Sequence, residues 1–169
     1  MTGARAIVVM GVSGCGKTSV AEGLAAALPA AFIEGDSLHP AANVEKMSRG
    51  IPLTDADRWP WLDTIGRALA DRLAEGRSVV VSCSALKKAY RDRLRHAAGG
   101  SLAFVFLKGS RELLMTRMAA RKGHFMPVSL LDSQLATLED PSGEPGVVTV
   151  DIDAPVERIV AAALAALEG

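Results

Sequence analysis

The sequence predicts a single three-layer α/β domain in which a parallel sheet is covered by helices on both faces. Short apolar runs rich in β-branched residues alternate along the chain with longer segments of helical periodicity, and this alternation is typical of α/β folds. At 169 residues the chain is long enough to bury its own core and has the usual size of one domain. We therefore expect residues 1–169 to form one domain.

Five apolar runs are the expected strands. Each is too short for a helix, and a continuous apolar character suits a strand buried on both faces of a parallel sheet. The runs are 6–10, 31–33, 78–81, 102–107 and 147–150.

Helical periodicity marks the segments between these runs. In 17–28, for example, Val20, Leu24 and Leu28 recur at intervals of four and lie on one helical face. Pro155 suits the first turn of a helix, because proline lacks a backbone N–H group and an N–H in that turn would have no helical partner. Strands that alternate with helices imply right-handed crossovers. The expected helices are 17–28, 61–73, 87–96, 112–121, 130–138 and 155–167.

Two stretches, 36–60 and 121–129, have the least regular periodicity and carry much of the unusual polar chemistry. We interpret them as functional insertions within the one domain. The first holds both tryptophans and a dense mixture of charges, which either forms a solvated face or lines a site for an anionic substrate.

The composition excludes several classes of protein. Hydrophobic residues make up 49% of the chain, which is incompatible with intrinsic disorder. Nineteen Lys and Arg balance nineteen Asp and Glu, whereas a general nucleic-acid or anionic-membrane binder needs a surplus of cations. Cys15 and Cys83 are too few for a disulfide framework, and no Cys/His spacing resembles a zinc site. Since no apolar run could span a bilayer and no secretory signal is recognisable, we expect a cytoplasmic protein.

The first chemical motif runs from Gly11 to Thr18 and matches G-x-x-x-x-G-K-[ST]. It follows an expected strand and opens an expected helix, as a phosphate-binding P-loop requires. Its glycines let backbone N–H groups point at an anion, and the helix adds the positive end of its dipole. Lys17 is expected to reach the β- and γ-phosphates of ATP, and the Thr18 hydroxyl to bind Mg²⁺. The predicted nucleotide-binding residues are Gly11, Ser13, Gly14, Cys15, Gly16, Lys17, Thr18 and Ser19.

Cys15 invites a second interpretation. A thiol at a helix start can be reactive, but no resolving partner lies nearby in the sequence. A small residue that fills space in the loop is the favoured interpretation.

Asp36 follows the expected strand 31–33 directly. Because ligands bind beyond the carboxyl ends of parallel strands, we expect Asp36 at the same sheet edge as the phosphate loop. A carboxylate there can orient an acceptor hydroxyl, take its proton or hold Mg²⁺ through a water molecule. The structural alternative is a carboxylate that only caps a turn.

Three further stretches, 35–62, 82–95 and 117–139, carry closely spaced motifs in order. Together with the phosphate loop they resemble the P-loop gluconokinase family. The motifs include Gly35-Asp36-x-Leu38-His39-Pro40-x-x-Asn43-x-x-Lys46-Met47, Asp55-x-Asp57-Arg58-x-Pro60-Trp61-Leu62, Ser82-Cys83-Ser84-Ala85-Leu86-Lys87-x-x-Tyr90-Arg91-Asp92, and Arg117-x-x-x-Arg121-x-x-His124-Phe125-Met126-Pro127.

The resemblance implies the reaction ATP + D-gluconate → ADP + 6-phospho-D-gluconate, with Mg²⁺. It also implies a P-loop kinase fold similar to the nucleoside monophosphate kinases, with a five-stranded parallel sheet, a substrate-binding segment at 36–62 and a mobile lid at 117–129. A homodimer is a further expectation from the family.

Gluconate is a small anion with a terminal hydroxyl, so it needs a base near the γ-phosphate and a cation for its carboxylate. Asp36 is the expected base and a second candidate for Mg²⁺ binding. Arg58 is the first choice for the carboxylate, because a guanidinium binds a carboxylate through two parallel hydrogen bonds. His39 either donates to sugar hydroxyls or fills a turn. Weaker candidates for the carboxylate, each with a surface charge as the alternative, are Lys46, Arg49 and Arg91. Ser84 and Lys87 follow the third expected strand on the acceptor side, and Lys87 is alternatively solvated. His124 of the expected lid is a further candidate for substrate binding.

Arg117 and Arg121 lie one helical turn apart at the start of the expected lid. A lid arginine that covers the phosphates would stabilise the charge on the transferred phosphoryl group. The alternative is a pair of exposed arginines at a helix end.

Two other functions stay open. One is a P-loop kinase of another small acceptor, such as a shikimate-like acid or a nucleoside monophosphate. The other is a nucleotide-binding switch without transfer, which would be expected to show a second sequence motif with a carboxylate for Mg²⁺ and a partner surface. Turnover of ATP that depends on a small sugar acid separates these functions.

Overall fold

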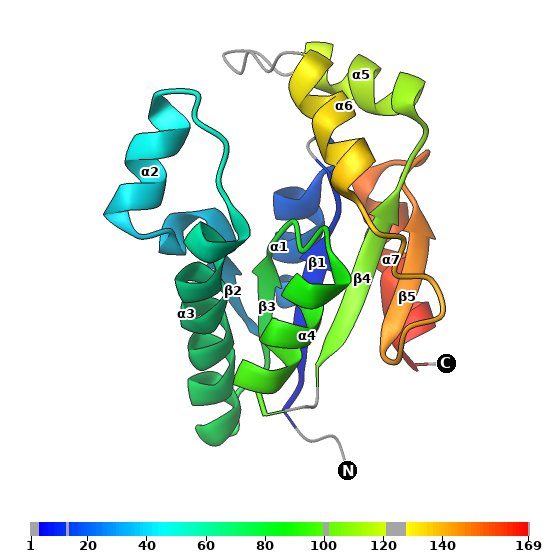
Figure 1. Ribbon diagram of the computed structural model, residues 1–169. Coiled ribbons are helices and arrows are strands. Elements are labelled where there is room, and N and C mark those ends of the chain that lie inside the picture. Colours follow the sequence, from blue (N-terminus) through cyan, green and yellow to red (C-terminus); the bar gives the residue numbers. More distant parts are fainter. Residues whose placement is uncertain (1–3, 13, 100–101, 121–127, 169) are drawn as a thin grey trace.

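The computed structural model describes residues 4–12, 14–99, 102–120 and 128–168. Its centre is a five-stranded parallel sheet with the strand order β2-β3-β1-β4-β5 (Figure 1), which confirms the predicted α/β P-loop kinase fold. The strands are β1 (Ala6–Met10), β2 (Ala31–Glu34), β3 (Val79–Ser82), β4 (Ala103–Lys108) and β5 (Val147–Asp151).

The apolar character of the runs follows from their positions in the sheet. β1 lies in the middle, where Val8 pairs in register with Val81 of β3 and with Phe104 of β4. All five residues of β1 are buried, because helices cover both faces of the sheet. β2 and β5 form the two edges and are only partly buried.

Helices cover the sheet on two sides (Figure 1). One core cluster joins α1 and α7 to Ile7 and Val9 of β1, and the other joins α3 and α4 to Val8 on the opposite face. The helices are α1 (Lys17–Ala27), α2 (Ala41–Ser48), α3 (Asp55–Ala74), α4 (Lys88–Ala97), α5 (Arg111–Ala120), α6 (Val128–Thr137) and α7 (Val156–Glu168). No helix among these described residues is long and apolar enough to cross a membrane.

The segment expected to be irregular is the main difference from the prediction. It contains a 3₁₀ turn, η1 (Gly35–Leu38), and the short helix α2, which projects from the body of the molecule (Figure 1). In addition, α3 begins at Asp55 rather than at Trp61, because Thr54 and Asp57 form a capping box. This segment is therefore largely helical.

α5 and α6 stand together beyond the carboxyl end of the sheet (Figure 1). Arg111 of α5 and Asp132 of α6 hold them together through two hydrogen bonds, with Nε 2.6 Å from Oδ1. Of the expected lid, the structure describes the end of α5 and the start of α6, and 121–127 lie outside the described residues.

Candidate active site

The phosphate loop connects β1 to α1, as predicted. Gly16 precedes α1 with a φ of 87°, which a residue with a Cβ rarely adopts. No side chain of the described residues caps the helix. The N–H groups of the first turn are therefore available to an anion. Lys17 folds back over the loop, and its Nζ lies 3.3 Å from the carbonyl oxygen of Val12.

The structure supports the space-filling interpretation of Cys15. The thiol is fully buried, and burial raises its pKa despite the nearby charge of Lys17. A neutral thiol is a poor nucleophile. Cys83 is similar, since burial raises its pKa to about 12.

A carboxylate that the sequence analysis missed lies beside the phosphate loop. The two oxygens of Glu34, at the end of β2, accept hydrogen bonds from Thr18 Oγ1 at 2.8 Å and from Ser82 Oγ at 2.6 Å. Ser82 ends β3, the strand between β1 and β2. Carboxylate and hydroxyl oxygens are the ligands that Mg²⁺ prefers, so Glu34 and Thr18 suit a magnesium site that takes few protein ligands.

Asp36 lies in η1, directly beyond the carboxyl end of β2. Gly35 allows this turn to approach β3 closely, because a Cβ on Gly35 would lie 2.1 Å from the carbonyl oxygen of Ser82. Trp61 Nε1 donates to the carbonyl oxygen of Gly35 at 2.8 Å and so holds the turn against α3. The Asp36 carboxylate is exposed, and no hydrogen-bond or ion-pair partner occupies it among the described residues.

His39 lies next to Asp36 and stacks on Trp61, with ring centroids 4.0 Å apart and an interplanar angle of 15°. Burial lowers the pKa of His39, the charge of Arg58 lowers it further, and Asp36 opposes both. His39 is therefore within electrostatic range of both Asp36 and Arg58. We call these three residues the acceptor row.

Arg58 is anchored at one of its nitrogens. Nη1 donates to the carbonyl oxygen of Leu53 at 2.8 Å and to the hydroxyl of Tyr90 at 3.2 Å. The guanidinium also lies over the Tyr90 ring, 5.3 Å from its centroid. Nε and Nη2 have no partner among the described residues, so one edge of the fork is free for a carboxylate.

Asp55 balances part of the positive charge around Tyr90. The Tyr90 hydroxyl donates to Asp55 Oδ1 at 2.6 Å, and Lys87 Nζ lies 3.4 Å from the same oxygen. The hydrogen bond from Tyr90 and the nearby Lys87 lower the pKa of Asp55, while burial and Asp55 raise the pKa of Tyr90 to about 12. Two predicted residues, Arg58 and Lys87, are thus brought together.

Other predicted residues lie elsewhere or are engaged. Lys46 binds both carboxylate oxygens of Asp57, at 3.0 and 2.8 Å, and this contact is the main reason that the pKa of Asp57 falls to about 2. Arg49 is exposed at the end of α2 and pairs with Glu45. Ser84 lies beside the phosphate loop, where its carbonyl oxygen accepts from Gly11 N. Ser13, Arg121 and His124 lie outside the described residues.

Arg117 contacts the connection between β5 and α7. Its Nη2 donates to the carbonyl oxygens of Ile152 and Ala154. The charge of Arg117 also contributes a lowering effect on the pKa of Cys15 in the phosphate loop, although burial raises that pKa overall. Arg117 therefore lies near the nucleotide side of the site, with its guanidinium partly bound to backbone.

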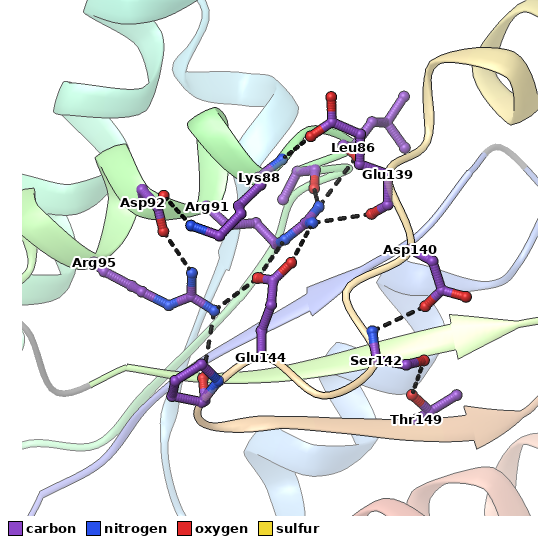
Figure 2. A network of polar contacts seen from close by, with 12 residues as sticks. Leu86, Lys88, Arg91, Asp92, Arg95, Glu139, Asp140, Ser142, Glu144 and Thr149 are labelled. Carbon is purple, nitrogen blue, oxygen red and sulfur yellow. Dashed lines mark hydrogen bonds and ion pairs between the residues drawn. The ribbon is translucent and has the colours of Figure 1, made fainter.

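Arg91 requires a correction. It was a weaker candidate for the substrate carboxylate, with a surface charge as the alternative, but it is completely buried. Figure 2 shows it between α4 and the segment that follows α6, where it binds Glu144 through Nε at 3.0 Å and Nη2 at 2.7 Å. The remaining donors bind the carbonyl oxygens of Ala85, Leu86 and Glu139. All five N–H donors of the guanidinium are therefore engaged, and Arg91 is a structural residue.

Arg91→Met is expected to lower the free energy of unfolding by about 3–5 kcal/mol, because it breaks a buried ion pair and leaves several acceptors unpartnered. For a chain of this size the melting temperature would fall by about 6–20 °C. Arg93→Met is the matched control, since Arg93 lies on the same helix and binds Asp63 through two hydrogen bonds but is exposed; it should cost about 0–1 kcal/mol. Equal melting temperatures for the two variants would contradict this role of Arg91.

Comparisons with known proteins identify the family of the chain. Residues 7–141 match the family model described as an AAA domain. A gluconokinase of Gluconobacter oxydans is 54% identical, with 86% of this chain and 82% of that protein covered. The chain belongs to the gluconokinase family. The thermoresistant gluconokinase of Escherichia coli is 46% identical over 93% of this chain and 90% of its own length. The crystal structure of a gluconokinase from Sinorhizobium meliloti superimposes with a TM-score of 0.88 at 58% identity, covering 99% of this chain and 94% of that one.

Three residues that contact the candidate site of this gluconokinase family member were not predicted. Glu34 binds Thr18, Tyr90 binds Arg58, and the amide nitrogen of Asn43 lies 3.2 Å from Nδ1 of His39. Glu34 had a usable signal, since it is a carboxylate at the carboxyl end of a strand, two residues before Asp36. Tyr90 and Asn43 stood in quoted motifs, but their contacts depend on how α2, α3 and α4 pack and could not be derived from spacing.

Proposed function

We infer that the chain is an ATP-dependent kinase that converts ATP and D-gluconate into ADP and 6-phospho-D-gluconate. The acceptor row is the observation that supports this inference most strongly. Among the described residues, the Asp36 carboxylate and the Nε–Nη2 edge of Arg58 have no partner, and His39 is in electrostatic range of both. A sugar acid has matching groups, a hydroxyl to be deprotonated and a carboxylate to be bound.

Thr18 and Glu34 are the residues that would hold Mg²⁺, with Asp36 as a further candidate. Their hydroxyl and carboxylate oxygens already meet at 2.8 Å, and Mg²⁺ in kinases is typically bound by one or two protein oxygens together with phosphates and water. When bound, Mg²⁺ neutralises charge on the β- and γ-phosphates. Lys17 and the N–H groups at the start of α1 act on the same phosphates.

We propose that Asp36 orients the 6-hydroxyl of gluconate and accepts its proton. The bond between this oxygen and the γ-phosphorus forms while the bond from phosphorus to the β–γ bridging oxygen breaks, and ADP leaves. Arg117 and Arg121 are proposed to stabilise the charge of the transferred group, as part of a lid that excludes water.

The carboxylate of gluconate is proposed to bind the free Nε–Nη2 edge of Arg58, with Lys87 beside it. Leu53 and Tyr90 hold Nη1 in place, so little freedom of the guanidinium is lost when the substrate binds.

Release of ADP tests this function. Mg-ATP is supplied with D-gluconate, other aldonic acids, shikimate or AMP in separate reactions. We expect selective stimulation by gluconate. Stimulation by another acceptor alone would overturn the substrate, and binding of ATP without any turnover would favour a nucleotide-binding switch.

Glu34→Gln is expected to raise the Mg²⁺ concentration that gives half-maximal activity by about 10-fold or more, because the charged partner of Thr18 is lost. The change is measured by titrating Mg²⁺ in the ADP assay at saturating gluconate. Glu22→Gln, an exposed position on α1, is the control and should leave this concentration unchanged. An unchanged requirement in Glu34→Gln would remove Glu34 from the metal site.

A homodimer in the cytoplasm is also proposed, on the strength of the resemblance to the family. Sedimentation of the purified chain with and without Mg-ATP tests the oligomeric state, and a monomer under both conditions would contradict the dimer.

A further inference from the structure

Asn43 is an unusual residue in the substrate-binding segment. It is the only asparagine of the chain, and it is 3% exposed although it lies on the projecting helix α2. Its amide nitrogen lies 2.9 Å from the carbonyl oxygen of Asp57 and 3.2 Å from Nδ1 of His39. A buried amide with two such contacts links α2 and α3 to the acceptor row.

The contact with Asp57 fixes the orientation of the Asn43 amide. A backbone carbonyl can only accept a hydrogen bond, so the group that faces it must be the NH₂ end of the side chain. The same NH₂ group then faces His39 Nδ1. The rotated amide would place two oxygens against each other and leave the carbonyl without this donor.

The orientation of Asn43 in turn fixes the state of His39. Because the NH₂ group of Asn43 donates a hydrogen bond to Nδ1, Nδ1 must be the ring nitrogen that carries no proton. In a neutral imidazole the proton is then on Nε2. Stacking on Trp61 holds the ring, and Nε2 has no partner among the residues that the structure describes.

We propose that Asn43 is a positioning residue that fixes His39 in the Nε2–H form, so that His39 donates a hydrogen bond to a hydroxyl of the sugar acid and does not act as the base. The proposal rests on the proposed function for the identity of the ligand. It assigns selectivity for a hydroxylated acceptor to His39, a role that the sequence left open, and leaves proton transfer with Asp36, the expected base.

The charged surroundings favour the same state of His39. Asp36 faces it from η1 and Arg58 from α3, while Asn43 and Trp61 are neutral. Burial and Arg58 together keep the pKa of His39 below its ordinary value. A protonated ring would turn an N–H group toward the N–H of Asn43. We therefore expect the neutral Nε2–H form throughout the neutral pH range.

The state of His39 can be measured without turnover. Long-range ¹H–¹⁵N spectra of the full chain with ¹⁵N-labelled histidine distinguish the two tautomers and the imidazolium, and the His39→Gln variant assigns the His39 signals. We expect Nε2–H in the unmodified chain and a mixture of forms in Asn43→Ala. A His39 ring protonated at Nδ1 in the unmodified chain at pH 7 would overturn the proposal, whether or not gluconate is a substrate.

Kinetics then separate positioning from a merely structural role. Asn43→Ala should raise the KM for gluconate by about 5-fold, the value of one hydrogen bond, with kcat and the KM for ATP nearly unchanged. His39→Gln retains a side-chain N–H near the position of Nε2 and should bind gluconate better than His39→Ala. On the His39→Gln background, Asn43→Ala should have no further effect on KM. The same increase on both backgrounds would mean that Asn43 only supports the fold, and this would overturn the proposal.

Discussion

Asp36→Asn is expected to lower kcat for gluconate phosphorylation by about 10²- to 10⁴-fold, the usual contribution of a general base. The amide keeps the size of the side chain and its place in η1, but it cannot accept the proton of the 6-hydroxyl. The affinity for ATP should change little, because Thr18, Glu34 and Lys17 remain. Steady-state kinetics with varied gluconate and direct ATP-binding measurements check both parts.

Asp71→Asn is a suitable control for this variant. Asp71 is an exposed carboxylate near the C-terminal end of α3, whereas Arg58 of the acceptor row lies near the start of this helix. The loss of the Asp71 carboxylate should therefore leave kcat unchanged. If Asp36→Asn kept the kcat of the unmodified chain, Asp36 would not be the general base, and another residue would have to accept the proton.

Arg58→Ala is expected to raise the KM for gluconate by about 30- to 100-fold, which corresponds to the loss of a charge-assisted, two-point hydrogen bond to the carboxylate. Its effect on kcat should be smaller, since Arg58 is proposed to bind the end of the substrate that does not react. Arg58→Lys should recover only part of the affinity, because an ammonium group lacks the planar fork.

Arg93→Ala is the matched control for Arg58→Ala. Arg93 also lies over an aromatic ring, that of Trp59, and also pairs with an aspartate, but it lies outside the acceptor row. Its removal should leave the KM for gluconate unchanged. An unchanged KM in Arg58→Ala would move the carboxylate site to another cation, with Lys87 the next candidate.

The sheet and most helices could be predicted because their residues repeat a pattern that burial imposes. Every expected strand is present, and no strand boundary differs by more than one residue. Ala6–Met10 was predicted without error, because it is buried along its whole length and ends at a glycine of the phosphate loop. The helix α2 was missed because it projects from the body and exposes Val44 and Met47 on its surface. It therefore lacks the buried apolar face whose regular spacing would predict a helix from the sequence.

The site could be predicted in part. Lys17, Thr18 and Asp36 follow from the rule that loops beyond parallel strands meet at one edge, and the structure places them there. This rule does not predict which charged side chains form ion pairs with one another. Arg91 and Arg58 are both arginines in charged segments of the sequence, but Arg91 is enclosed by Glu144 and three carbonyl groups. Arg58 instead has one edge without a partner among the residues that the structure describes. That distinction depends on contacts between residues far apart in the chain.

The position of the phosphoryl group on the product shows whether the chain transfers phosphate from ATP to the 6-hydroxyl of gluconate. Two-dimensional ¹H–³¹P NMR of a completed reaction with Mg-ATP and D-gluconate identifies the carbon that bears the phosphate. We expect a single product with phosphate coupled to the two hydrogens on carbon 6, and almost none of it after the same reaction time with Asp36→Asn. Phosphate on any other carbon, or ADP formed with free phosphate and unchanged gluconate, would contradict the proposed reaction.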